Sequence, residues 1–269
     1  MNAKRMLAAA CGVSVMLVSA TLPAQTIARR VAQVKDGSVR MSFASRSDVC
    51  GNGAGNISTR NGRTMNSNGS GGYSTTRHNE WEDDCEAGPV RVAIDVADGK
   101  PIALRAYVGG RWRPGTGVTD LGMVPVKDAV DFLLDNLARS DGKVAGEAIF
   151  PATIADSVIV WPRLLTLAKD DSRSRDVRKQ AVFWVSQAAG EKATAGLVDV
   201  VGDAAADQDV RLQAVFAISQ RPKDEGIPAL LEIAKHSKDP RIRKQSIFWL
   251  GQSGDPRAIA YFEAILVKK

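Results

Sequence analysis

The spacing of apolar residues changes partway along the chain. In the N-terminal part, segments 89–96 and 101–108 alternate apolar and polar side chains, as half-buried strands do. The Asp-Gly pair at 98–99 suits a tight hairpin turn, and a partial alternation over 38–46 predicts another strand. From Val126 onward, apolar residues recur every three and four positions, which predicts amphipathic helices. The pattern therefore predicts a mostly-β region followed by an all-α region.

One stretch of the helical part occurs three times. Segment 176–187 (DVRKQAVFWVSQ) returns at 209–220 (DVRLQAVFAISQ) and again at 241–252 (RIRKQSIFWLGQ), at spacings of 33 and 32 residues. Self-similarity at such a period is typical of stacked repeats, in which each unit buries its apolar face against its neighbours. The helical part is therefore predicted to be an array of helix pairs.

A degenerate first copy lies upstream, with Pro151 in the place that Trp184 holds in the next copy. Proline lacks an N–H, so we expect it to kink this helix or to end it early. A partner helix precedes each copy and one more begins at 255–256, which gives nine predicted helices in about four and a half pairs. Good N-cap residues recur at one repeat position, namely Asp141, Ser174, Asp207 and Asp239.

The repeat resembles a known family. Tetratricopeptide and ankyrin signatures are absent, whereas each second helix carries Val-Arg-x-Gln-Ala-Val, or Ile-Arg-x-Gln-Ser-Ile in the last copy, after a cap residue. This pattern is similar to the short HEAT-like repeat, including the type first named from phycobilin lyases. The resemblance covers 127–269, and no family is recognised in 26–126.

The resemblance implies both a fold and roles for some residues. It implies that Arg178, Arg211 and Arg243 lock neighbouring repeats, and that the second helices line a concave face. The first copy departs from the pattern, because Ala145 replaces the arginine. The expected fold class is α+β with two domains. These are a small, disulfide-linked, mostly-β domain at 26–117 and an all-α HEAT-like α-solenoid at 127–269.

The first residues are typical of a secretory signal peptide. Two basic residues precede an apolar run over 6–22, and small residues follow, so we expect a leader at 1–24. A lipoprotein signal ending at Cys11 is the alternative. No later segment contains the roughly 18 apolar residues that a membrane helix requires. The mature protein is thus expected to be secreted or periplasmic, without a transmembrane segment.

Two cysteines, Cys50 and Cys85, remain after the leader, and we expect them to form a disulfide in an oxidising compartment. They enclose a Gly-, Asn- and Ser-rich segment, 51–80, which is interpreted as a long loop. A phosphate-cradling loop at 51–56 is the alternative, although no helical pattern follows it. The acidic residues around Cys85 are interpreted as a solvated turn, with calcium binding as the alternative. The histidines, His78 and His236, are too scattered to suggest zinc, so no metal site is expected.

The composition and the motifs of the sequence argue against some classes of function. The net charge of +6 and the pI of about 9.3 reflect a small excess spread over the surface, unlike the clustered basic footprint of a nucleic-acid binder. No nucleophile motif, metalloprotease motif or P-loop is found, so neither an enzyme nor a cofactor is expected. The leading hypothesis is an extracytoplasmic scaffold that binds a protein or peptide. The alternatives are an envelope or substrate-attaching module acting through the β domain, and an enzyme of the HEAT-like lyase type.

The repeats also share a stripe of residues beside the buried face. A helical projection places a Gln-x-x-Phe-x-x-x-Gln pattern on one flank of each second helix. A residue needed only for solubility would be free to vary among copies, as Lys179 and Leu212 do. One interpretation is a structural ladder that joins the repeats, and the other is an edge that grips an extended peptide. The stripe residues are Gln180, Phe183, Gln187, Gln213, Phe216, Gln220, Gln245, Phe248 and Gln252.

Overall fold

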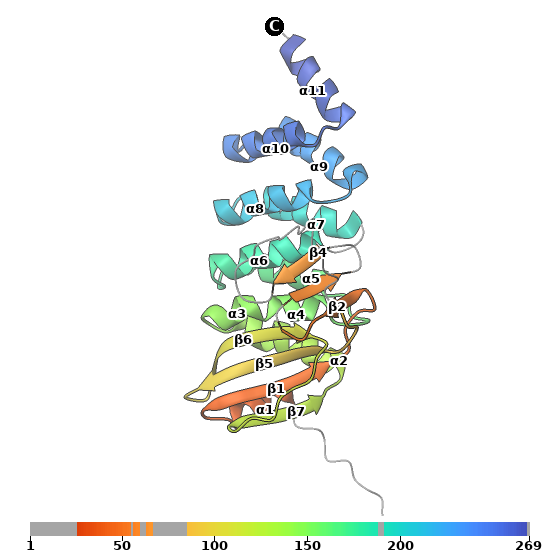
Figure 1. Cartoon of the computed structure of the whole chain (residues 1–269). Helices are drawn as coiled ribbons and strands as arrows, with labels where there is room; N and C mark the ends of the chain where they lie inside the picture. Colours follow the sequence, from red (N-terminus) through yellow and green to blue (C-terminus); the bar gives the residue numbers. More distant parts are fainter. Residues whose placement is uncertain (1–25, 55, 60–62, 67–84, 188–190, 268–269) are drawn as a thin grey trace, which may run out of the picture.

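The computed structural model describes residues 26–54, 56–59, 63–66, 85–187 and 191–267 (Figure 1). The expected leader at 1–24 lies outside these residues, as do His78 and the acidic run at 80–84. The N-terminal part is mostly β and the C-terminal part is helical, as the change of period predicted.

A four-stranded sheet organises the N-terminal part. The hairpin predicted at 89–96 and 101–108 is confirmed, with Asp98 and Gly99 at φ values of 50° and 71° in its turn. The strand order is β6-β5-β1-β7, with β1 antiparallel to β5 and parallel to β7. The strands are β1 (Gly37–Phe43), β5 (Val90–Ala97), β6 (Lys100–Val108) and β7 (Val118–Met123).

Strand β7 was missed in the sequence. It begins just after 117, the predicted end of the β domain, and only Leu121 among its side chains is buried. Its Gly122 has a φ of 68°, and the six residues show no regular alternation. Pairing with β1, which is distant in sequence, makes this segment a strand, and a local pattern could not reveal it.

The segment predicted as a loop contains a second, antiparallel sheet. Strands β2 (Val49–Gly51), β3 (Asn56–Thr59) and β4 (Arg63–Asn66) lie in the order β2-β3-β4, so the loop interpretation is wrong for this part of 51–80. Few large apolar residues mark these strands, and Ile57 is fully buried. Burial of Val49 and Ile57 together with backbone pairing suffices where the sequence is mostly polar and glycine-rich.

The cysteine pair lies within disulfide distance. The Cα atoms of Cys50 and Cys85 are 5.2 Å apart, and the structure joins the two side chains. Next to them, Gly51 and Glu86 exchange two backbone hydrogen bonds of 3.0 Å. A Cβ atom on Gly109 would lie 2.9 Å from the Gly51 carbonyl oxygen, so only glycine allows this approach. The bridge therefore ties β2 to the segment that directly precedes β5.

Helices form the remainder of the described chain. A short N-terminal helix, α1 (Ile27–Ala32), was not predicted, and the Thr26 hydroxyl caps it. Helix α2 (Val126–Asp131) continues through a π-helical turn (Phe132–Asn136) and a 3-10 turn (Leu137–Arg139). The helices that follow are α3 (Lys143–Glu147), α4 (Ile149–Thr153), α5 (Trp161–Lys169), α6 (Arg175–Ser186), α7 (Glu191–Gly202), α8 (Gln208–Ser219), α9 (Lys223–His236), α10 (Pro240–Gln252) and α11 (Pro256–Val267).

The break between α3 and α4 has a local cause. Pro151 has no N–H to donate to the carbonyl of Glu147, which is the last residue of α3. The helix resumes in α4 for a single turn and ends at Thr153. The early end expected from Pro151 is confirmed.

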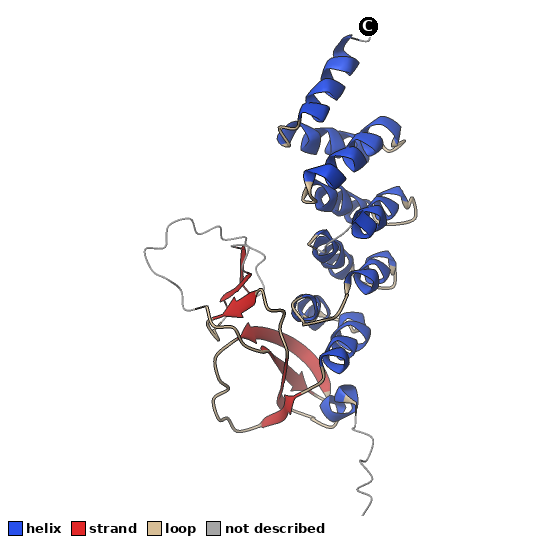
Figure 2. Cartoon of the chain, turned by 90° about the vertical axis from the view of Figure 1, so that its right-hand side faces the viewer, coloured by secondary structure: helices blue, strands red, loops and turns tan. Residues whose placement is uncertain are grey.

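The helix pairs pack on one another along the chain (Figures 1 and 2). Helix α6 contacts α8 and α8 contacts α10, while α5, α7 and α9 form a second row. The apolar core runs without interruption from the sheet into the helices. Glu147 on α3 accepts a 2.8 Å bond from the Leu104 backbone N–H on β6, which joins the sheet to the first pair. Within the described residues, no helix is long and apolar enough to cross a membrane.

Candidate functional site

The second helices of the pairs, α6, α8 and α10, begin directly after predicted cap residues. Ser174 accepts a 3.3 Å bond from the Val177 N–H, and Asp239 accepts bonds from the backbone N–H groups of residues 241 and 242. Asp207 stands at the cap position of α8 but makes no such side-chain bond. For α3 the prediction was wrong, because Gly142 rather than Asp141 occupies the cap.

Two of the predicted locking arginines contact the cap of the following repeat. The Arg178 guanidinium is buried and donates to the Asp207 carboxylate. Arg211 donates to the Asp239 carboxylate at 2.9 Å and to the Val201 carbonyl at 2.9 Å. Arg243 is exposed and donates to the Ser237 carbonyl in the loop before its own helix. The equivalent arginines therefore make different contacts.

The Asp239 carboxylate is held in its charged form. Burial by itself would raise its pKa, but hydrogen bonds from the Ile242 and Arg241 backbones and the nearby Arg211 charge outweigh it. The net effect lowers the pKa of Asp239 below its ordinary value. The pair of Arg211 and Asp239 is thus an ion pair at neutral pH.

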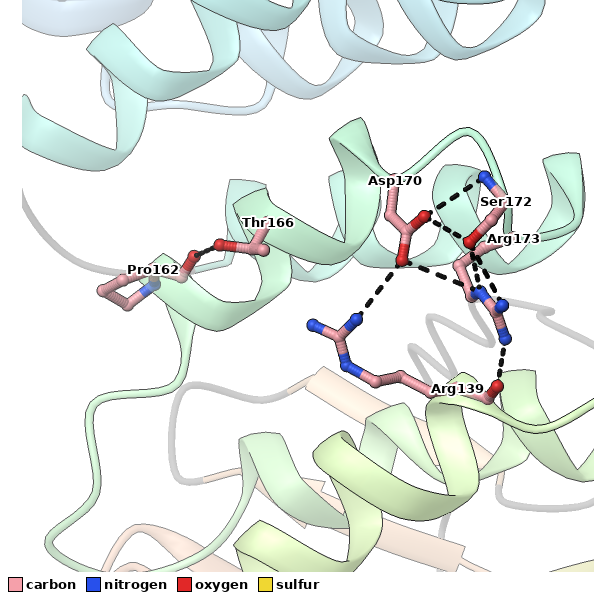
Figure 3. A network of polar contacts seen from close by, with 6 residues as sticks. All are labelled: Arg139, Pro162, Thr166, Asp170, Ser172 and Arg173. Carbon is pink, nitrogen blue, oxygen red and sulfur yellow. Dashed lines mark hydrogen bonds and ion pairs between the residues drawn. The ribbon is translucent and has the colours of Figure 1, made fainter.

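A different polar network joins the first pair to the second, where Ala145 replaces the arginine (Figure 3). Asp170, just after α5, accepts a 3.2 Å bond from Arg139 and bonds of 3.1 and 2.5 Å from Ser172. Arg173 donates to the Arg139 carbonyl and to the Ser172 hydroxyl. The Ser172 hydroxyl bond lowers the pKa of Asp170. Loop residues therefore supply the link that a helix arginine supplies elsewhere.

The stripe phenylalanines lie in two aromatic clusters. In the first cluster, Trp184 stacks on Phe150 at 5.1 Å and meets the edge of Phe183 at 5.0 Å. In the second, Trp249 lies 5.1 Å from Phe216 and 5.0 Å from Phe248. The first cluster is Phe150, Phe183 and Trp184, and the second cluster is Phe216, Phe248 and Trp249.

Exposure differs along the stripe. Phe183 and Phe216 are half-buried, whereas Phe248 is 51% exposed. Each cluster spans two successive repeats, and in α8 the buried Ala217 stands where α6 and α10 carry tryptophan, so α8 has no tryptophan that could join the two clusters. The structure thus combines features of both interpretations, because Phe216 packs on the next repeat while Phe248 faces solvent.

Sequence reasoning did not identify the tryptophans as part of this surface. In a helical projection of α6, Trp184 falls on the buried face, but the structure leaves it half-buried against Phe150. A helical projection shows only the direction of each Cα position and ignores the length of the side chain. A large indole at the edge of the apolar face can therefore extend beyond the surface where two helices pack. The Phe-Trp pair repeated at 183–184 and 248–249 was the available signal.

The stripe glutamines are polar neighbours of the aromatic clusters. Gln187 donates to the Ser186 hydroxyl at 2.9 Å and Gln220 to the Ser219 hydroxyl at 3.2 Å, each within its own helix. The amide of Gln180 lies against Gly146 of α3, where an added Cβ would come within 3.0 Å of Nε2. The six stripe glutamines differ in exposure: three are half-buried, namely Gln187, Gln213 and Gln245, and three are exposed, namely Gln180, Gln220 and Gln252.

A second group of side chains lies on the four-stranded sheet. Arg40 and Arg91 approach the Trp112 ring, with Cζ-to-centroid distances of 4.8 and 5.8 Å. Their guanidinium groups donate to the carbonyls of residues 109, 110 and 113. These contacts hold segment 109–113 against the sheet, so this group has a structural role.

Two hollows lie between the first helices of successive pairs. One, of about 110 Å³, is lined by Leu134, Asp135, Arg139, Arg163, Thr166 and Leu167. The other, of about 430 Å³, lies between α7 and α9, where the buried Arg221, which sequence reasoning missed, bonds to Thr194 at 2.9 Å and to Glu225 at 2.8 Å. Across the part of the chain that the structure describes, no three His, Cys, Asp or Glu residues are grouped as metal ligands.

The comparison with protein families agrees with the stacked helix pairs. The family model for HEAT repeats matches residues 196–269, from within α7 to the end of the chain. This part of the chain is thus similar to HEAT repeats, as the resemblance implied, and no family matches the N-terminal region. No curated protein matches the chain.

Proposed function

We propose that this protein is an extracytoplasmic scaffold whose HEAT-like α-solenoid, over 127–269, binds a protein or peptide on the face formed by α6, α8 and α10. HEAT repeats fit a protein-interaction or scaffold role. The predicted leader and the Cys50–Cys85 pair support an extracytoplasmic location. The proposal assigns no catalytic role and no cofactor.

The observation that carries this proposal is the presence of aromatic side chains on successive second helices. Large aromatic residues that are partly exposed in neighbouring repeats are typical of binding surfaces, since they bury much area on contact. Phe248 and its neighbour Trp249 lie on α10, and Phe183 with Trp184 lie on α6. A surface of this kind suits an apolar partner segment.

Replacing Phe248 with alanine tests the proposal. Because the ring is 51% exposed, the free energy of unfolding is expected to fall by less than about 1 kcal/mol. Capture of partners from a native envelope extract, measured by cross-linking and pull-down, is expected to drop by about tenfold, as for loss of an anchor worth 1–2 kcal/mol.

Ile102→Ala is the matched control, because Ile102 is 54% exposed and lies on β6 rather than on α6, α8 or α10. This variant should retain full capture. Equal capture by wild type and Phe248→Ala would refute the proposal, and a loss confined to Ile102→Ala would favour a module that acts through the β region. Point variants are preferable to separate fragments, because the sheet and the first helix pair share one core.

A further inference from the structure

We infer that the ligand of this face is an extended peptide with two large apolar residues about six positions apart and acidic residues beside the one that meets α10. The inference rests on the proposed function and specifies the partner. Three features carry it: the separation of the two aromatic clusters, the charge of α10, and the glutamines beside the rings.

The separation sets the spacing of the anchors. The clusters are centred on α6 and α10, and α8 packs between these helices. Packed helices lie about 10 Å apart, so α6 and α10 are roughly 20 Å apart. An extended chain rises about 3.3 Å per residue and therefore covers this distance in about six residues. An even number of residues also places both anchors on the same side of the peptide.

The gap between the clusters makes the spacing selective. Phe150 and Phe183 gather around Trp184, while Phe216 and Phe248 gather around Trp249. On α8, Phe216 belongs to the second cluster, and Ala217 offers no ring at the tryptophan position that could join it to the first. An unbroken aromatic row would accept anchors at any spacing, whereas two separate clusters favour one.

The charges on α10 determine which end of the peptide lies at that helix. Helix α10 carries the exposed cations Arg241, Arg243 and Lys244 and contains no acidic residue. Lys244 lies four residues before Phe248 and so on the same side of the helix. Among the ion pairs of the described residues, none involves these three cations. On α6, the negative charge of the exposed Asp176 offsets the positive charge of Lys179. Acidic residues of the peptide therefore gain more electrostatic attraction at α10 than at α6.

The glutamines favour an extended ligand over a helical one. Gln180 is exposed on α6, Gln220 directly after α8, and Gln252 at the end of α10. A side-chain amide both donates and accepts hydrogen bonds, which matches the free N–H and C=O groups of an extended backbone. A helical ligand satisfies these groups internally and would leave the glutamines without such partners.

The experiment uses synthetic 14-residue peptides of serine and glutamine with two leucines and one pair of aspartates. Leucine spacings of five, six and seven residues are compared, with the aspartates at either end, together with a single-leucine peptide. Affinity for the full chain is measured by fluorescence anisotropy of labelled peptide. We expect the six-residue spacing to bind about tenfold tighter than five or seven, because odd spacings direct one leucine away from the protein.

Two variants separate the contribution of the aromatic rings to peptide affinity from that of the charges on α10. Phe248→Ala should reduce the affinity of the six-residue peptide to that of the single-leucine peptide. Arg241→Gln/Lys244→Gln should abolish the preference for the position of the aspartates, whereas Lys192→Gln/Lys235→Gln, which removes two exposed lysines from α7 and α9, should leave that preference intact.

Affinity that does not depend on spacing, or that Phe248→Ala leaves unchanged, would overturn the inference. So would the absence of any gain from the second leucine. The proposed function is judged separately, by capture of partners with Phe248→Ala. Loss of capture in that assay, combined with no spacing preference here, would retain a binding face and reject the two-anchor peptide.

Discussion

Replacing Cys50 and Cys85 together with serine is expected to lower the free energy of unfolding by about 4 kcal/mol. The bridge closes a loop with a sequence separation of 35, and the chain-entropy model gives roughly this value for such a loop. The β2-β3-β4 sheet has short strands and few buried side chains, so it has little else to keep it folded. Urea denaturation followed by circular dichroism measures the change.

Reduction provides the control for this experiment. Dithiothreitol should destabilise the wild-type protein by about the same amount and should leave the serine variant unchanged. Thiol titration of the unfolded wild-type protein, purified from an oxidising compartment, adds a direct check. Reactive thiols from both cysteines in that titration would contradict the predicted bridge.

The second large effect is expected for Arg211→Met, which should cost about 3 kcal/mol of stability at neutral pH. The side chains of Arg211 and Asp239 are 13% and 19% exposed, so the substitution leaves a carboxylate largely buried without its cation. The Val201 carbonyl also loses its donor. Urea denaturation at pH 7 measures the loss, and Asp239→Asn in the same chain should recover part of it.

The size of this effect should depend on pH. The pKa of Asp239 is lowered in the folded protein, so its contribution is present above the unfolded pKa of about 3.9 and is lost as pH falls through the folded value. The difference between wild type and Arg211→Met should therefore shrink below about pH 4. A difference that stays constant down to pH 2 would show that the ion pair is not its source.

Arg243→Met is the matched control, because Arg243 occupies the same repeat position. It is exposed and bonds to the Ser237 carbonyl, so its loss should cost less than about 1 kcal/mol. Equal losses for Arg211→Met and Arg243→Met would show that repeat position, rather than the contact with the next cap, determines stability.

Much of the helical part could be predicted, because its signals are local. The three-and-four spacing, the cap residues before α6, α8 and α10, and Pro151 each act within one or two turns of helix. The β5-β6 hairpin was predictable for the same reason, since its alternation and its turn are adjacent in sequence.

The elements that were missed depend on distant partners. Strand β7 pairs with β1 across most of the N-terminal region, and β2 is held beside residues near Cys85. Helix α1 has only six residues, so it is stabilised by burying Ile27 and Val31 rather than by its own propensity. A short segment of sequence does not contain both of the residues that form such a contact.

The sequence by itself determined the period of the repeat, the location of the caps before α6, α8 and α10, and the residues on each helix flank. Only the tertiary structure decided what those equivalent residues do. Phe216 and Phe248 hold the same position in their copies, yet Phe216 is half-buried beside Trp249 of the next second helix while Phe248 is 51% exposed. The exposure of a residue depends on which side chains of the neighbouring repeat pack against it, whereas the helical pattern shows only the face of the helix on which the residue lies.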